Sequence, residues 1–216
     1  MNERTRILLT GFEPFASDSI NPSLEVAKAL DGAHIDEARI VAASLPCVFG
    51  AARTAMKQLL KQHHPSLVLA TGLAGGRSAI GLERVAINVD DARIADNAQQ
   101  QPEDLPVIAG APAAYFSTLP IKAMLAAMRA AGYPVEVSNS AGTFVCNHLF
   151  FSLQHSLRKS KTRSGFMHLP YLPEQAARLV HQPSMALDSM VEATRIALQS
   201  AWRTSVDIRQ EGGTLD

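Results

Sequence analysis

The sequence predicts an α/β protein, a three-layer α/β/α sandwich with a twisted, mostly parallel (mixed) central sheet. Short apolar runs rich in β-branched residues alternate with helical patterns, which is the order of elements in layered α/β folds. Most of these runs are apolar on both faces, as strands are when helices cover both sides of a sheet. With 216 residues, 47% of them hydrophobic, the chain can bury a substantial core. We expect one domain over residues 1–216.

Six apolar runs have the length and composition of strands, and they occupy residues 6–10, 39–45, 67–71, 84–89, 135–138 and 165–169. Five helical patterns lie between or after them, at residues 22–30, 50–63, 120–131, 146–159 and 185–204. The first helix has Asn21 as its N-cap and Pro22 at its first position. The third follows Ser117 and Thr118 and ends before Gly132, a residue typical of helix ends.

Two segments lack a periodic pattern. Residues 90–113 are polar and contain three prolines, and such a stretch is too long for a passive connection in a compact domain. We expect it to be a lid, a pocket wall or a subunit contact. The polar tail at residues 205–216 is expected to be mobile.

Composition excludes several classes of partner. Twenty basic and twenty acidic residues give zero formal charge, and no basic stripe with interleaved aromatics offers a nucleic-acid footprint. We therefore expect no nucleic-acid partner. We expect no membrane partner and no export, because no long apolar stretch or signal-peptide pattern is present. Two cysteines without such a signal indicate free thiols in a reducing compartment, which predicts a cytoplasmic location.

The segment SAGTFVCNHLF, at residues 140–150, carries the strongest chemical signal because it places Cys146 where a helix is expected to begin. A thiol at a helix N-terminus feels the positive end of the helix dipole and unpaired N–H groups, which favour the thiolate. The same N–H groups can receive an oxyanion. This turn therefore predicts a nucleophile together with part of its transition-state stabilisation.

A dimension argument selects His168 as the candidate base. A helix from Cys146 to about residue 159 rises roughly 20 Å, and a six-residue strand ending near residue 169 descends about the same distance. His168 then returns to the level of Cys146, which is the geometry of a βαβ unit. Taken alone, a histidine in GFMHLP is more often a hydrogen-bonded core residue, and only its pairing with Cys146 favours the functional interpretation.

Other polar residues have simpler interpretations. His148 lies two residues from Cys146 and points to a different helix face, so we expect it, like His155, to be structural or exposed to solvent. Cys47 follows an apolar strand without a nearby base and is interpreted as a small buried hydrophobe. Glu83 is interpreted as an exposed charge at the start of a strand or a partner of Arg84. The remaining histidines show no spacing that would hold a metal, so no metal site is predicted.

Two glycine-containing loops follow predicted strands. GLAGGR at residues 72–77 could cradle a phosphate, but it lacks the nucleotide-binding patterns, and tight packing beside a pocket explains it better. GFEPF at residues 11–15 brings Phe12 and Phe15 to the same predicted crevice, although both are ordinarily core residues.

Six blocks of sequence are specific in combination: GFEPF (11–15), NPS (21–23), GLAGGR (72–77), LERVAINVDDARIADN (82–97), SAGTFVCNH (140–148) and GFMHLPYLPEQ (165–175). Together they closely resemble the pyroglutamyl peptidase I family of cysteine peptidases, also called pyrrolidone-carboxylate peptidases. The resemblance extends from about residue 6 to about residue 200. It implies an enzyme that hydrolyses the bond after an N-terminal pyroglutamyl residue through a thioester, without a cofactor.

The resemblance also implies roles for individual residues. It carries a catalytic triad onto Cys146 as nucleophile, His168 as acid and base, and Glu83 as the residue that orients the histidine. It places Arg93 near the oxyanion. The substrate pocket that it implies is lined by Phe12, Phe15, Asn21, Phe144 and Val145.

Two positions depart from the family pattern. Family members commonly have GQAGG where this chain has GLAGG, so Leu73 removes an amide beside the site, and they usually have glycine where Ala16 stands. These changes leave the triad intact. The resemblance implies peptides with N-terminal pyroglutamate as partners and a homo-oligomer, a dimer or a tetramer. The alternatives are a phosphorylase-like transferase that uses GLAGGR for phosphate, or an inactive pyroglutamyl-binding protein on the same fold.

Overall fold

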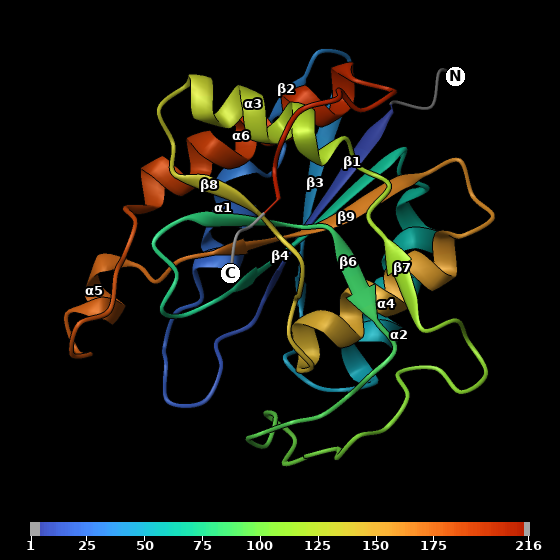
Figure 1. Ribbon diagram of the computed structural model, residues 1–216, viewed down its shortest axis with the longest axis vertical. Coiled ribbons are helices and arrows are strands. Elements are labelled where there is room, and N and C mark those ends of the chain that lie inside the picture. Colours follow the sequence, from blue (N-terminus) through green and yellow to red (C-terminus); the bar gives the residue numbers. More distant parts are fainter. Residues whose placement is uncertain (1–4, 214–216) are drawn as a thin grey trace.

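The computed structural model describes residues 5–213, and its centre is a twisted mixed sheet (Figure 1). Seven strands form it, namely β1 (Arg6–Phe12), β2 (His34–Ile35), β3 (Ala38–Leu45), β4 (Leu67–Leu73), β5 (Ile80–Glu83), β8 (Val135–Ser138) and β9 (Arg163–Leu169). Their order within the described range is β2-β3-β1-β4-β9-β5-β8. Strands β3, β1, β4 and β9 are parallel, whereas β2 is antiparallel to β3, and β5 is antiparallel to β9. The predicted mixed, mostly parallel sheet is confirmed.

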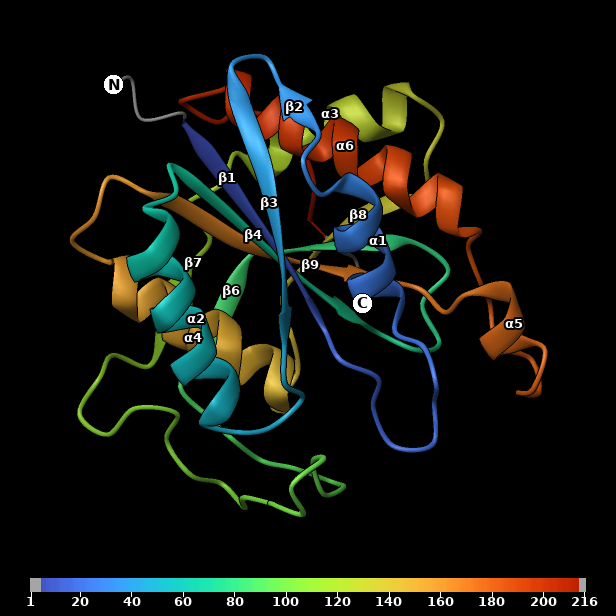
Figure 2. The same cartoon turned by 180° about the vertical axis from the view of Figure 1, so that it is seen from behind.

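Helices cover both faces of this sheet (Figures 1 and 2). One layer contains α1 (Pro22–Leu30), α3 (Ile121–Ala130) and α6 (Leu187–Arg203), and the other contains α2 (Ala51–His63) and α4 (Val145–Leu157). A short helix, α5 (Pro173–Ala176), follows β9. Helix α1 begins as predicted, since Asn21 accepts a hydrogen bond from the Ser23 backbone N–H and Pro22 occupies the first turn.

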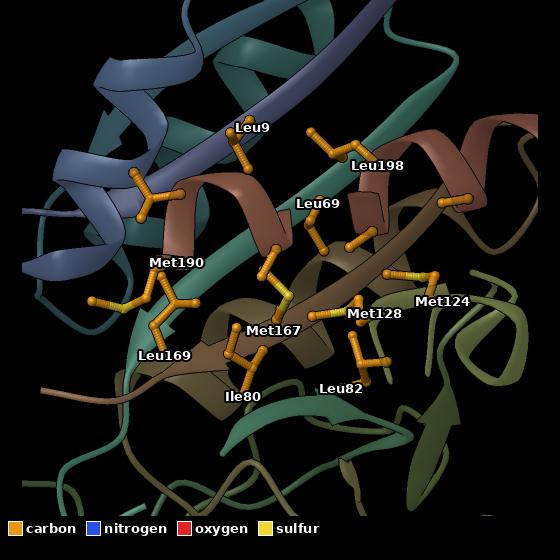
Figure 3. Packing of buried hydrophobic residues seen from close by; sticks show 14 of the residues in the cluster. Leu9, Leu69, Ile80, Leu82, Met124, Met128, Met167, Leu169, Met190 and Leu198 are labelled. Carbon is orange, nitrogen blue, oxygen red and sulfur yellow. The ribbon is translucent and has the colours of Figure 1, made fainter. Parts of the chain in front are cut away.

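Two apolar clusters hold the three layers together. Figure 3 shows the cluster beneath α3 and α6, where Leu9 and Leu69 of the central strands meet Met167 of β9 and Leu198 of α6. The second cluster lies between the sheet and α2 and α4, and it includes Phe150 and Phe166. Strands β1, β4 and β9 are buried on both faces, which explains why each reads as a continuous apolar run.

The expected strand at residues 84–89 forms as a shorter strand outside the main sheet. The chain leaves the main sheet after Glu83, and β6 (Val85–Ile87) pairs instead with β7 (Ala114–Phe116) in a separate two-stranded sheet. Asn147 of α4 holds β6 there, because its side chain accepts from the Ile87 N–H and donates to the Ile87 carbonyl. Strand β5, which was not predicted, lies in the main sheet between β9 and β8.

The expected βαβ unit is wrong. Strand β8 is parallel to β5, and β5 is antiparallel to β9, so α4 connects two strands of opposite direction with β5 between them. His168 nevertheless lies at the level of the start of α4, because the lengths of α4 and β9 set this level and the direction of β8 does not.

The long segment at residues 90–113 packs against α4, and it is drawn in green at the bottom of Figure 1. Val107 within it belongs to the apolar cluster under α4, and the Asp91 backbone N–H donates to the Thr143 carbonyl. In the tail, Asp207 accepts hydrogen bonds from the first turn of α3, and Gly212 accepts one from Arg84. The last part of the predicted mobile tail, residues 214–216, lies outside the described residues.

None of the helices in residues 5–213 combines the length and the apolar character that crossing a membrane requires.

Candidate active site

Cys146 lies in the first turn of α4, close to where the sequence predicts it. The N-cap residue Phe144 has extended backbone angles, and its side chain makes no capping hydrogen bond within the described chain. The first intrahelical bond joins the His148 N–H to the Phe144 carbonyl at 3.0 Å. The N–H groups of residues 145–147 precede that bond and are available at the helix end. They form the positive end of the helix dipole in the turn that carries Cys146.

The sulfur lies over the carboxyl ends of β4 and β9. Gly72 of β4 is opposite His168 of β9 in the parallel register, and a Cβ built on Gly72 would come within 2.9 Å of both the Cys146 Sγ and the Phe166 ring. Phe166 and His168 alternate by two along β9 and so project from the same face, with ring centroids 4.9 Å apart. The Cys146 thiol and the His168 imidazole therefore share one face and one level of the sheet.

Glu83 completes this group from β5. It is opposite Phe166 in the antiparallel register and so lies diagonally from His168 on the same face. The His168 Nδ1 is 2.7 Å from the Glu83 Oε1, and both side chains are buried, with exposed fractions of 4% and 0%. The structure thus brings together all three residues of the expected triad. With Nδ1 bonded to the carboxylate, Nε2 is the imidazole nitrogen left for proton transfer.

Arg77 is the polar residue of the site that the sequence analysis missed. Its Nη1 donates to the Glu83 Oε1 at 2.9 Å, and its Nη2 contacts the Ser140 carbonyl at 3.4 Å. The expected pairing of Glu83 with Arg84 is wrong, since Arg84 donates to the Gly212 carbonyl instead. Glu83 is also buried and not an exposed strand-start charge. The position of Arg77 at the end of the GLAGGR block was the only available signal.

The ionisation of Cys146 differs from the expectation drawn from the helix dipole. Burial raises the pKa of the Cys146 thiol, Cys47 and Glu83 add to the rise, and the Arg77 guanidinium opposes it. Burial affects the thiol pKa more than the helix dipole does, because removing a thiolate from water costs more free energy than a dipole interaction near the surface provides. The surroundings of Cys146 therefore favour the thiol over the thiolate, and a nearby base is needed to remove its proton.

Aromatic side chains form a wall beside the start of α4. Phe144 makes edge-to-face contacts with Phe15 and Phe49, each with ring centroids 5.3 Å apart. Phe15 and Phe144 are half-buried and present ring surface, whereas Phe12 is only 2% exposed and packs on Phe166. Val145 is buried in the cluster under α4. Of the expected pocket residues, Phe15 and Phe144 are the two with accessible rings.

The Asn21 side chain is occupied by hydrogen bonds within the protein. Its Oδ1 accepts from the N–H and the hydroxyl of Ser23, and its Nδ2 donates to the Glu13 carbonyl at 3.0 Å. Asn21 therefore ties the start of α1 to the loop that carries Phe15. It also lines the same pocket as Phe15.

Arg93 is exposed in the long segment at residues 90–113. Two residues earlier, Asp91 exchanges hydrogen bonds with Thr143, its N–H donating to the Thr143 carbonyl and its own carbonyl accepting from the Thr143 hydroxyl. These bonds anchor the segment immediately before the start of α4.

Comparison with known proteins gives a consistent result. A family model described as pyroglutamyl peptidase matches residues 5–204. The chain is 57% identical to the pyrrolidone-carboxylate peptidase of Cupriavidus taiwanensis, with 97% of this chain and 98% of that one covered. It is 53% identical to that of Pseudomonas fluorescens, covering 96% and 97% of the two chains.

Solved structures agree with these matches. The crystal structure of pyroglutamyl peptidase I from Bacillus amyloliquefaciens superposes with a TM-score of 0.94 at 41% identity, covering 96% of this chain and all of that one. A mutant pyrrolidone carboxyl peptidase from Pyrococcus furiosus gives a TM-score of 0.88 at 40% identity, with 92% and 98% covered. The chain belongs to the pyroglutamyl peptidase family. Membership confirms the expected cysteine-type hydrolase of N-terminal pyroglutamyl residues, and the transferase and inactive-binder alternatives are not favoured.

The two departures from the family pattern lie in one place. Leu73 and Ala16 line the same pocket of about 270 Å³, together with Phe15 and Tyr171. Ala16 has a φ of 55°, a left-handed conformation that strains every residue except glycine. The structure thus explains why glycine suits this position.

The residues given simpler interpretations have structural surroundings. His148 is buried, its Nδ1 is 2.8 Å from the Asp90 carboxylate, and its Nε2 accepts from the Gly50 N–H at 3.1 Å. His155 contacts the Tyr115 hydroxyl at 2.9 Å. Cys47 is buried, as expected. The Asp90–His148 contact, invisible in the sequence, fastens the segment at residues 90–113 to α4.

Proposed function

We propose that Cys146, His168 and Glu83 act as nucleophile, acid–base and orienting carboxylate in the hydrolysis of N-terminal pyroglutamyl peptides. The observation that carries the proposal is the 2.7 Å contact between the Glu83 carboxylate and the His168 Nδ1, beside a sulfur that lies over Gly72. This arrangement leaves the His168 Nε2 free for the thiol proton. The reaction needs no cofactor.

In the first step, the His168 Nε2 takes the proton of the Cys146 thiol as the sulfur attacks the pyroglutamyl carbonyl carbon. The thiol is partly buried and has a raised pKa, so proton transfer and attack are coupled and the base is essential. Glu83 accepts the Nδ1–H throughout, which fixes the tautomer and stabilises the imidazolium as it forms. A tetrahedral intermediate with a negatively charged oxygen results.

The oxyanion is held at the start of α4. The backbone N–H groups of residues 145–147 are the donors, because the first intrahelical hydrogen bond begins only at His148. Arg93 adds a positive charge from the segment at residues 90–113, which the Asp91–Thr143 bonds hold next to this turn.

Collapse of the intermediate releases the peptide. His168 donates its proton to the leaving amine, the C–N bond breaks, and a thioester on Cys146 remains. Water then loses a proton to His168 and attacks the thioester, which releases pyroglutamate and returns the thiol. The 5-oxoproline ring is neutral and five-membered, so it suits the ring surfaces of Phe15 and Phe144 more than a charged pocket. Phe12 and Val145 support this wall from the core, and Asn21 holds its loop.

The test measures amine release from a pyroglutamyl amide by the wild type, Cys146→Ala and Cys47→Ala. Cys146→Ala should be inactive, whereas Cys47→Ala, which removes the other thiol, should keep kcat near the wild-type value. Activity in Cys146→Ala would remove that residue from the nucleophile role. Arg93→Ala should lose about 10²–10³ in kcat if Arg93 is an oxyanion group. An unchanged rate would strip Arg93 of this role.

We also propose that the chain acts as one catalytic domain, forms a homo-oligomer and works in the cytoplasm. Near-zero formal charge favours association, and the two free cysteines suit a reducing compartment.

Light scattering on the purified protein tests the oligomer, which a monomer would contradict. Calorimetry tests the single domain, which two separate unfolding transitions would contradict. Activity recovered outside the cytosolic fraction of cells would contradict the location.

A further inference from the structure

The orienting carboxylate of the site has a second partner, which the reaction scheme above leaves without a role. The Glu83 Oε1 receives both the His168 Nδ1 at 2.7 Å and the Arg77 Nη1 at 2.9 Å, whereas Oε2 is buried without a hydrogen-bond partner in the described chain. A single oxygen therefore carries every hydrogen bond that the described residues make to this carboxylate. Its position determines the direction of the imidazole.

A carboxylate with no exposed surface is costly unless a cation or several donors accompany it. Arg77 supplies that cation, and about a quarter of its side chain, 27%, remains exposed. Without the guanidinium, the His168 imidazole would be the only described partner of the buried carboxylate. The ion pair thus compensates the burial of the carboxylate that accepts the Nδ1–H.

The fold reserves space for this guanidinium. A Cβ built on Gly81 would lie 2.4 Å from the Arg77 Nη1, so the absence of a side chain on β5 lets the group reach Glu83. The other end of the fork, Nη2, contacts the Ser140 carbonyl in the loop that leads to α4. Arg77 therefore joins the segment after β4, the carboxylate on β5 and the approach to Cys146.

We propose that Arg77 is a positioning residue of the reaction, which acts through Glu83 to hold the His168 imidazole toward Cys146. This inference rests on the proposed function of the triad. It gives a role to Arg77, the last residue of the GLAGGR block. The sequence of that block suggested phosphate binding or close packing. The positive charge also opposes the rise in the pKa of the Cys146 thiol.

Two variants perturb Arg77 in different ways. Arg77→Gln removes the charge, and Gly81→Ala keeps it but displaces the guanidinium, since the group that must move is the end of a flexible side chain. Arg84→Gln is the matched control, because Arg84 is adjacent to Glu83 in sequence but donates to the Gly212 carbonyl. Arg77→Lys keeps the charge without the fork geometry.

We expect kcat on a pyroglutamyl amide to fall about tenfold or more in Arg77→Gln and several-fold in Gly81→Ala, with KM within about threefold of the wild type. Arg77→Lys should lie between Arg77→Gln and the wild type, and Arg84→Gln should match the wild type. Alkylation of Cys146 by iodoacetamide should need a higher pH in Arg77→Gln, because the cation that lowers the thiol pKa is gone.

A merely structural ion pair would lower the unfolding midpoint of Arg77→Gln and leave kcat of the folded protein unchanged, which would overturn the inference. If Arg77→Gln does not fold, Gly81→Ala decides, and a wild-type kcat in that variant overturns it. Failure of the proposed function has a different signature, namely activity that survives in Cys146→Ala. An active wild type, an inactive Cys146→Ala and an unaffected Arg77→Gln would reject Arg77 alone.

Discussion

Gly72 and His168 face one another across the parallel pair β4 and β9, and the space above Gly72 is taken by the sulfur of Cys146. A side chain on Gly72 would point directly at that sulfur and at the Phe166 ring, each 2.9 Å from the added carbon. The glycine is thus a requirement of the site, since it lets a helix end approach the sheet closely enough for thiol and imidazole to meet.

Gly72→Ala should lower kcat by about 10²-fold, because the added methyl displaces the sulfur and a misplacement of about 1 Å has that effect on a reacting group. Steady-state kinetics on a pyroglutamyl amide measures this change. Gly165→Ala on β9 is the control, since its Cβ meets Ser117 and Leu119 and not the site. The control should lose stability but keep kcat per folded molecule, and an equal loss of kcat in both variants would argue against a local effect.

The stability of the protein should fall at alkaline pH because of Cys47. Burial, followed by Asp96 and Glu13, raises its pKa from 9.0 to about 12. The folded state therefore favours the protonated thiol, and this contribution is complete below pH 9 and is lost as the pH rises toward 12. The difference in unfolding free energy between the wild type and Cys47→Ala should shrink from about pH 9 to about pH 11. Urea titrations measure it, and a difference that stays constant contradicts the prediction.

Asp90→Ala should destabilise the protein by about 1–3 kcal/mol, because it leaves the buried His148 Nδ1–H without its acceptor. The bond joins the segment at residues 90–113 to the first turns of α4, so kcat/KM should fall as well. Urea unfolding and steady-state kinetics test both effects. Glu103→Ala is the control, since Glu103 is exposed on the same segment and should leave both quantities near their wild-type values.

Ala16→Gly should stabilise the protein slightly. The left-handed φ of 55° costs alanine about 1–2 kcal/mol, whereas glycine costs about 0.4–1 kcal/mol through the entropy of the unfolded chain. The net gain should be about 1 kcal/mol or less, read from the urea midpoint. Ala43→Gly, in the extended strand β3 where φ is unstrained, should instead be destabilising. Destabilisation of Ala16→Gly would show that the backbone strain of alanine in this loop is smaller than the entropy cost of glycine.

The elements predicted well are those whose signals are local. The N-cap Asn21, the proline after it and the continuous apolar runs of β1, β4 and β9 depend on neighbours within a few residues, and the structure agrees with them. The short strands β2, β5 and β7 were missed, because two to four residues carry too little periodicity to distinguish a strand from a loop. Strand β6 lies outside the main sheet, which no local signal indicates, because Asn147, sixty residues away, holds it there.

The same division applies to the site. The position of Cys146 at a helix start and the roles implied for His168 and Glu83 come from the sequence, through a helix signal and a family resemblance. Arg77 could not be found this way, since its meaning depends on the antiparallel entry of β5 beside β9 and on the space above Gly81. The raised pKa of the Cys146 thiol was missed for a related reason, because burial is a property of the packed molecule.

The sequence by itself determined the layered fold, the chemical identity of the nucleophile and the family, because apolar periodicity, capping residues and motif blocks are written along the chain. Only the tertiary structure decided which strands run antiparallel, which cation accompanies Glu83 and in which direction burial shifts the pKa of the Cys146 thiol. These properties depend on groups brought together from distant parts of the chain, and the free energy of a buried charge is set by its surroundings in space.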